Sequence, residues 1–266
     1  MRPFNLRIPG ARMKLVGGDS GRVEDEQFVS EVLIAPSERA VVDVLFEDPG
    51  ESHFEHAGPD QSYTLGTVTV HDWPIEQAYA QEFSILRSNP EFMSERTGLH
   101  DELEREPDKT LALVAVMPGM KHHGGGHGHM HMPEIEWEDT MALHNRMTTP
   151  KNMFWKLVDR ETRAENHDIH WSFRLGDRAK IRIVNDPHSD HPMQHPVHIH
   201  GERFLVLSRD GVSNDNLVWK DTVLIRTGET VDLLTEMSNP GRWMAHCHIA
   251  EHLEGGMMLS FEVREP

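Results

Sequence analysis

Histidine pairs surround the only cysteine of this chain, and this feature most constrains what the chain can form. Residues 195–201 read HPVHIHG, and residues 246–257 read HCHIAEHLEGGM. A thiolate, two imidazoles and a distant thioether are the ligands of a trigonal blue-copper site with weak axial sulfur. Cys247, His252 and Met257 can supply three of these ligands from one loop, and His195 the fourth from a neighbouring strand.

The other histidines of the two stretches have a different expected orientation. Alternate side chains of a β-strand share a face, so His198 and His200 should point together. His246 and His248 flank Cys247 and should face away from it. Four converging imidazoles predict a second copper centre, joined to the first through the backbone of Cys247. Ordinary histidine-rich strands are disfavoured, because bunched imidazoles repel one another when protonated and are costly to bury.

Residues 134–264 resemble the last cupredoxin domain of the multicopper oxidases, a family of laccase-like enzymes and metallo-oxidases. The resemblance rests on the two histidine stretches and on the segments LVWKDTVLIRTGETVDLL and NPGRWMAHCHIAEHLEGGMM. It implies copper as cofactor, with type 1 ligands His195, Cys247, His252 and axial Met257, type 2 ligand His198, and type 3 ligands His200, His246 and His248. Cys247 and His252 are then the catalytic residues of electron transfer, with His252 at the substrate-facing edge of the type 1 site.

Strand-like segments predict an all-β protein. From residue 134 onward, short strands follow one another without helical periodicity, which is typical of a Greek-key β-sandwich. They span residues 169–173, 179–184, 204–207, 222–225 and 230–234. By resemblance, residues 134–266 form a complete, copper-binding cupredoxin domain.

Residues 1–70 predict further short strands, at 4–8, 13–16, 28–34, 39–46 and 63–70. The segments FNLRIPGARMKLVGGDSG and VLIAPSERAVVDVLF resemble the second half of the middle cupredoxin domain of a three-domain oxidase. Half a sandwich leaves an apolar face and strand edges without partners. We therefore expect a partial cupredoxin domain here, and a chain that is a piece of a longer protein.

Residues 71–133 are predicted to form a connector, with a short acidic helix over 94–106 and a strand over 111–117. It ends in the segment MKHHGGGHGHMHM at 120–132. Two interpretations stay open for this histidine- and methionine-rich segment. It is either a solvated linker, or a loop that captures copper transiently through imidazole and thioether groups.

Charge and composition exclude several classes of function. A net charge of −18 argues against nucleic acid and anionic membranes as partners. No apolar run is long enough to span a bilayer, and one cysteine excludes an internal disulfide. The first residues, MRPFNL, lack the pattern of a signal peptide, which predicts a cytoplasmic chain as written. The resemblance instead implies a periplasmic or extracellular protein, as members of the family are commonly exported.

The resemblance also implies partners. Dioxygen would be the electron acceptor, and a phenol or a metal ion the reductant. In the family, a trinuclear copper site reduces dioxygen, and half of its ligands come from two His-x-His motifs in the first cupredoxin domain. His127-Gly128-His129 and His129-Met130-His131 have that spacing, but in glycine-rich sequence. We therefore expect the missing ligands of the trinuclear site to come from an absent N-terminal domain, a second chain or an oligomer.

Three further points stay open from the sequence. A type 1 electron carrier without oxidase activity and a copper-sequestering or resistance protein are the alternative functions.

Met193, with Asp190 and His191, could form a site for a metal substrate or only shape the copper pocket. Where some bacterial members carry glutamate after the last type 1 histidine, this chain has Leu253. A proton relay would then use Glu251, Glu254 or a carboxylate outside this chain.

Overall fold

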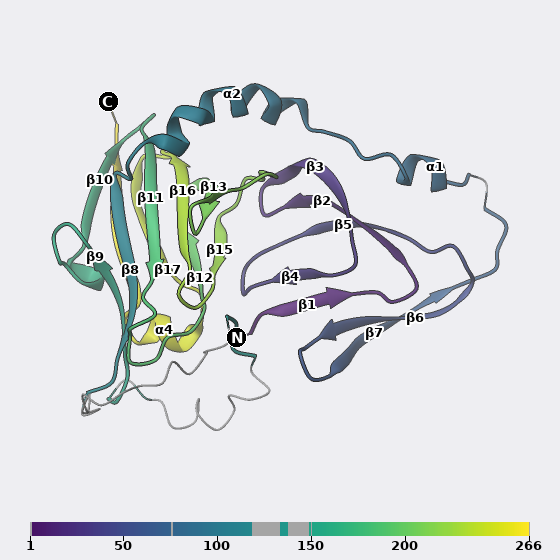
Figure 1. Cartoon of the computed structure of the whole chain (residues 1–266), viewed down its shortest axis with the longest axis horizontal. Helices are drawn as coiled ribbons and strands as arrows, with labels where there is room; N and C mark the ends of the chain where they lie inside the picture. The colour runs from purple at the N-terminus through teal and green to yellow at the C-terminus, as the bar shows by residue number, and fades with distance from the viewer. Residues whose placement is uncertain (1, 76, 119–133, 138–148, 150, 266) are drawn as a thin grey trace.

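The protein is described by a computed structural model that covers residues 2–75, 77–118, 134–137, 149 and 151–265 (Figure 1). The histidine- and methionine-rich segment at 120–132 lies outside these residues. The N-terminal strands are β1 (Phe4–Arg7), β2 (Arg12–Gly18), β3 (Gly21–Val29), β4 (Val32–Ile34), β5 (Val41–Leu45), β6 (Gly50–Ala57) and β7 (Ser62–Val70). They are followed by α1 (Ala80–Phe83), α2 (Pro90–Glu104) and β8 (Lys109–Val116).

The C-terminal elements follow at short intervals, as the sequence predicts. They are β9 (Phe154–Asp159), the 3-10 helix η2 (Asn166–Asp168), β10 (His170–Arg174), β11 (Arg178–Asn185), β12 (His195–Ile199), β13 (Arg203–Arg209), β14 (Val212–Ser213), β15 (Thr222–Ile225), β16 (Thr230–Glu236), β17 (Gly241–Cys247), α4 (Ala250–Glu254) and β18 (Met258–Arg264).

Two of the sheets pack face to face as a β-sandwich (Figure 1). One has the strand order β10-β18-β17-β12-β15, and the other β14-β13-β16-β11-β8-β9. Strand β13 shows how the side chains divide. Phe204 and Val206 join the large apolar cluster between the sheets, whereas Leu205 and Leu207 join a smaller cluster. This alternation is the period-two pattern of a strand that is covered on both faces.

Helix α2 covers that outer face. Phe92 and Leu99 of the helix pack with Leu205 and Leu207 in the smaller cluster. Asn89 accepts a hydrogen bond from the backbone N–H of Glu91 and caps the helix start. At the other end, the buried Lys180 ammonium on β11 donates to three carbonyl oxygens of residues 102–105. A cation there complements the partial negative charge of a helix C-terminus.

Strand β8 lies within the range that the sequence predicts as a connector. It pairs in parallel with β11 and antiparallel with β9 in the six-stranded sheet. Leu111, Leu113 and Ala115 are buried in the sandwich core. The alternating apolar residues of this strand therefore complete the core of the C-terminal half.

The N-terminal strands form two smaller sheets, ordered β4-β1-β6-β7 and β3-β2-β5. They lie beside the strands β12, β13 and β15 of the sandwich (Figure 1). Backbone hydrogen bonds cross the contact, from Glu24 N–H to the carbonyl of Leu217 and from Ser20 N–H to the carbonyl of Trp219. The N-terminal sheets therefore dock on the sandwich around residues 214–224. Among the described residues, no helix combines the length and apolar composition that a membrane span requires.

Candidate metal centre

Three neighbouring elements bring together the cysteine and two of the histidines. His195 is the first residue of β12, Cys247 is the last residue of β17, and His252 lies in α4. Strands β12 and β17 pair antiparallel, with Val197 opposite Cys247 and His198 opposite His246. His195, two residues before Val197, therefore shares the inner face of the sheet with Cys247. The turn into α4 returns His252 to the same place.

The donor atoms of this group converge on one point. Sγ of Cys247 lies 3.6 Å from Nδ1 of His195 and 3.4 Å from Nδ1 of His252. The two Nδ1 atoms are 3.1 Å apart. The three ligand atoms all lie within 4.8 Å of one another. Such a cluster of soft sulfur and imidazole nitrogen fits a copper ion.

Burial makes the same three groups poor acids and bases in the absence of a metal. Desolvation raises the pKa of the Cys247 thiol to about 12 and lowers the pKa of His195 to about 3. Burial also holds the pKa of His252 well below its ordinary value. A thiolate here needs a cation beside it, and neutral imidazoles present lone pairs. The donor set thus fits a bound metal better than it fits protons.

The backbone holds Met257 beside this group. The N–H of Cys247 donates to the carbonyl of Met257, and the N–H of Met257 donates to the carbonyl of His252. The Met257 side chain is fully buried and belongs to the sandwich core. The structure therefore keeps the thioether-bearing residue next to the cysteine and histidine that precede it.

An indole ring stacks on the buried imidazole of His252. Trp155, on β9, stacks on the imidazole with ring centroids 3.6 Å apart and an interplanar angle of 23°. It meets His195 edge-on, at 5.7 Å. A Cβ at Gly255 would come within 2.9 Å of the indole, so the chain needs a glycine there. His252, expected at the substrate-facing edge, is 3% exposed and lies beneath this ring.

The other four histidines gather on the opposite face of the same strands. The His198 and His200 ring centroids are 4.5 Å apart, and those of His246 and His248 are 5.3 Å apart. Nε2 of His200 lies 3.0 Å from Nε2 of His246. We call these four residues the histidine group. Gly201, which follows it, has a φ of +76°, and a Cβ there would overlap the indole of Trp243.

Hydrogen bonds fix some nitrogens of the histidine group and leave others for a ligand. Nδ1 of His246 faces the carbonyl oxygen of Cys247 at 2.8 Å, so it donates and Nε2 carries the lone pair. The buried Nδ1 of His248 has no hydrogen-bond partner among the described residues. Burial, followed by the neighbouring histidines, lowers the pKa of His198. Neutral imidazoles with unshared lone pairs suit a second metal site.

The three residues considered for a metal substrate make different contacts in the loop before His195. Asp190 accepts a hydrogen bond from the N–H of Met117, and the carbonyl of Met193 accepts one from Asn185. His191 instead faces Glu136, with Nε2 3.8 Å from the carboxylate. Desolvation raises the pKa of Glu136 to about 7. Both carboxylates considered for a proton relay, Glu251 and Glu254, are exposed.

Fold and donor set together define a β-sandwich protein with a buried His2Cys metal centre and a neighbouring group of histidines. A family model described as multicopper oxidase matches residues 136–266. Residues 136–266 belong to the multicopper oxidase family, and copper is the metal that this family implies.

Individual relatives agree. A multicopper oxidase of Staphylococcus aureus is 32% identical over 135 residues, which are 45% of this chain and 29% of that protein. Laccase-1 of Melanocarpus albomyces is 33% identical over 99 residues, which are 30% of this chain and 16% of the laccase. Both matches involve a minor part of the relative.

Solved structures match nearly the whole chain. A metallo-oxidase of Campylobacter jejuni, 22% identical, superimposes with a TM-score of 0.63 over 99% of this chain and 51% of its own length. The chain thus spans about half the length of that structure. This likeness confirms the predicted all-β, cupredoxin-like β-sandwich.

Sequence reasoning missed two parts of the surroundings. Trp155 lies in a strand with no feature that marks it as a neighbour of His252. Asp221 and Thr222 contact His198, and Arg39 contacts Asp221 from the N-terminal half of the chain. Only the segment VWKDTV, noted for its resemblance to the family, pointed toward this second set.

Proposed function

We propose that this chain is the C-terminal part of a copper-dependent oxidoreductase that transfers electrons from a small reductant to dioxygen. Type 1 copper would be held by His195, Cys247, His252 and axial Met257. The second site would use His198 for type 2 copper and His200, His246 and His248 for type 3 copper. Bound copper supplies one-electron redox chemistry at the first site and the reduction of dioxygen to water at the second.

The observation that carries this proposal is the arrangement of three consecutive residues. Cys247 faces the inner, buried site, while His246 and His248 belong to the histidine group on the other face. The Cys247 side chain and the adjoining backbone therefore form a short covalent connection between the two sites. A protein that only carries electrons has no use for the histidine group, so this arrangement favours the oxidase over the blue-copper carrier.

The residues around the first site have separate roles in this proposal. The apolar core excludes water from Cys247, which stabilises a thiolate–metal bond against exchange with solvent. Trp155 stacks on His252 and would pass the reductant's electrons to the site. The reductant is a phenol or a metal ion, as the family resemblance implies.

The histidine group provides only part of a trinuclear site. Further imidazoles would come from a second chain, an oligomer or sequence outside this chain, and the location would be periplasmic or extracellular. We propose residues 134–266 as the copper-binding domain, with β8 added to its sheet, residues 71–133 as the connector and residues 1–70 as part of a second cupredoxin domain.

Copper reconstitution of the purified chain tests the proposal. We expect an intense blue absorption from one copper per His2Cys site, and Cys247→Ser should abolish it without loss of the fold. His195→Gln should act similarly, whereas the exposed His170→Gln is the matched control and should leave the spectrum unchanged. Copper binding without a blue absorption would contradict the proposal and favour copper sequestration. Dioxygen uptake should appear only when the missing imidazoles are supplied.

A further inference from the structure

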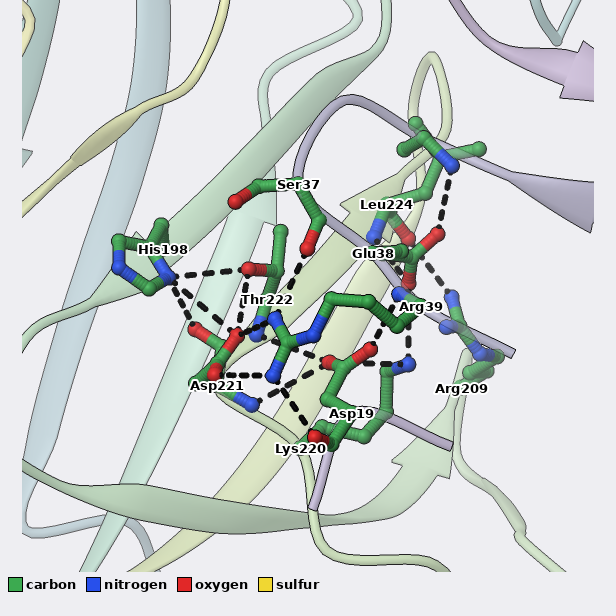
Figure 2. Close-up of polar contacts among 11 residues, drawn as sticks. Asp19, Ser37, Glu38, Arg39, His198, Arg209, Lys220, Asp221, Thr222 and Leu224 are labelled. Atoms are coloured by element: carbon green, nitrogen blue, oxygen red, sulfur yellow. Dashed lines mark hydrogen bonds and ion pairs between the residues drawn. The ribbon is translucent and has the colours of Figure 1, made fainter. Parts of the chain in front are cut away.

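Arg39 reaches from the N-terminal half of the chain into the C-terminal sandwich. It lies in the loop between β4 and β5, and its guanidinium makes two hydrogen bonds of 2.6 Å to the Asp221 carboxylate (Figure 2). Asp221 directly precedes β15, which pairs with β12, the strand that bears His198. A bidentate pair of this kind fixes orientation as well as distance.

One buried carboxylate fixes both partners of this ion pair. The side chain of Asp19, fully buried, accepts a hydrogen bond from the backbone N–H of Arg39 at 2.7 Å. It also lies 3.3 and 3.2 Å from the N–H groups of Asp221 and Thr222. The Asp19 carbonyl accepts a further bond from the Arg39 guanidinium. The ion pair therefore has little freedom to rearrange.

Asp221 and Thr222 in turn hold one nitrogen of His198. Nδ1 lies 2.9 Å from the carbonyl oxygen of Asp221 and 2.9 Å from the hydroxyl oxygen of Thr222 (Figure 2). The Thr222 hydroxyl donates its proton to the Asp221 carboxylate at 2.8 Å. A carbonyl oxygen can only accept, and the hydroxyl proton is already engaged. Nδ1 of neutral His198 must therefore carry the proton, which leaves the lone pair on Nε2.

We propose that Arg39 is a positioning residue for His198, acting through Asp221 and Thr222. By holding the Asp221 carboxylate, Arg39 keeps the Thr222 hydroxyl turned away from His198, so that the imidazole presents Nε2 unprotonated to the histidine group. The use of Nε2 as a copper ligand rests on the proposed function, but the tautomer of the metal-free protein does not.

The structure offers an ion pair that separates this role from simple docking. Arg96 on α2 binds the carboxylate of Glu24 on β3 and the carbonyl of Asp215, and so also joins the N-terminal sheets to the sandwich. None of these contacts involves a histidine. Arg96→Gln should weaken docking as Arg39→Gln does, but without a route to His198.

Nitrogen-15 NMR of histidine side chains in the metal-free, full-length chain reads the tautomer directly. Spectra at about pH 8, where ordinary imidazoles are neutral, are assigned by comparison with His198→Gln. We expect one tautomer with the proton on Nδ1 in the unaltered chain and in Arg96→Gln. In Arg39→Gln the freed Thr222 hydroxyl can donate to Nδ1, and both tautomers should be populated. Arg39→Lys keeps the charge but not the bidentate hydrogen bonding, so its tautomer populations should lie between those of the unaltered chain and Arg39→Gln.

A double variant tests whether Arg39 acts on His198 through the Thr222 hydroxyl. Arg39→Gln combined with Thr222→Val leaves only acceptors opposite Nδ1, the Asp221 carbonyl and the Asp221 carboxylate at 3.5 Å, so the single tautomer should return. Titration with Cu(I), followed on the His198 ring signals, should show about tenfold weaker binding in Arg39→Gln. The blue absorption of the His2Cys site should be unchanged in that variant.

The outcomes distinguish the positioning role of Arg39 from the proposed function of the chain. A single tautomer that persists in Arg39→Gln, or an equal change in Arg96→Gln, overturns the positioning role. So does a proton on Nε2 in the unaltered chain. If copper gives no blue absorption in the unaltered chain, the proposed function fails, while the tautomer result still decides the role of Arg39. Should Arg39→Gln fail to fold, Arg39→Lys with and without Thr222→Val gives the same reading.

Discussion

The two halves of the chain achieve order by different means. Between the sheets of the C-terminal sandwich, apolar side chains from both sheets form one continuous buried cluster. In the described residues 2–70, the buried apolar side chains are those of Pro3, Met13, Val23 and Ala35. Phe28 and Val41 in these sheets are 44% and 52% exposed. The hydrophobic effect therefore stabilises the C-terminal half far more than the N-terminal half.

Buried charges take the place of apolar contacts in the N-terminal half. Lys14, Glu24 and Glu26 are each at most 5% exposed. The Lys14 ammonium lies 3.1 Å from the Glu26 carboxylate, and Glu24 binds Arg96. Buried ion pairs fix orientation but contribute little net stability, because desolvation offsets their attraction. The candidate metal centre therefore lies in the half whose order depends on apolar packing, while the N-terminal half is attached through ion pairs.

The largest expected effect tests whether apolar packing stabilises the C-terminal sandwich more than the N-terminal sheets. Phe204, fully buried between the sheets, should cost about 3–5 kcal/mol of unfolding free energy when replaced by alanine. Phe28→Ala is the matched change in the N-terminal sheets and should cost less than about 1 kcal/mol. Denaturant titrations followed by tryptophan fluorescence measure both. Equal losses would show that the N-terminal sheets depend on apolar packing after all.

A smaller effect is expected from the charged half. Lys14→Met removes one partner of Glu26, which keeps hydrogen bonds from Arg22 and from the backbone N–H of Arg87. Because the carboxylate is not left unpaired, the expected cost is about 1–3 kcal/mol, confined to β2 and β3. Amide hydrogen exchange of these strands should accelerate while β12 and β17 stay protected.

Lys109→Met is the control for this change, since Lys109 pairs with a Glu161 side chain that is 70% exposed. An exposed pair contributes about 0–1 kcal/mol. If Lys14→Met also accelerates exchange in β12 and β17, the two halves unfold together and the comparison fails.

The sequence predicted the parts of the molecule whose residues are close in the chain or alternate regularly. Strand β15 has the predicted bounds, and β10 and β16 begin or end within two residues of theirs. In β15 apolar residues dominate, as expected where both faces are covered, whereas β10 alternates the buried Trp171 and Phe173 with exposed polar residues. Cys247 and His252 are five residues apart, so one turn into α4 brings them together. Their assignment to type 1 copper stays a proposal.

What the sequence did not reveal depends on polar residues in unusual places. Strand β3 begins at Gly21, before the predicted residue 28. The sequence did not predict this part because its buried positions include Glu24 and Glu26, where apolar residues are usual. Strand β6 was missed because its sequence, GESHFEHA, has few strand-forming residues. A predicted strand over 28–34 is divided in the structure between β3 and β4. Arg39 and Asp221 are 182 residues apart, and no local pattern pairs them.

The smallest expected effect concerns pH and the attachment between the halves. The Arg96 guanidinium, which hydrogen-bonds Glu24, holds the pKa of this carboxyl below its ordinary value. A carboxyl with a lowered pKa in the folded state stabilises the fold above its unfolded pKa of about 4.3. That contribution is lost as the pH falls through the folded pKa. Docking of the N-terminal sheets should therefore weaken in acid.

Glu24→Gln isolates this contribution. The amide oxygen can accept from Arg96 and Leu217, but the amide NH2 group cannot accept, so the charge and one of the two hydrogen bonds from Arg96 are lost, at a cost of roughly 1 kcal/mol at pH 7. The cost should shrink as the pH falls through the folded pKa of Glu24, because the unaltered carboxyl then gains a proton. Exchange protection of β3 against pH measures it, with the exposed Glu262→Gln as control. A cost that stays unchanged as the pH falls would mean that the shape of Glu24, rather than its charge, attaches the N-terminal half to the C-terminal sandwich.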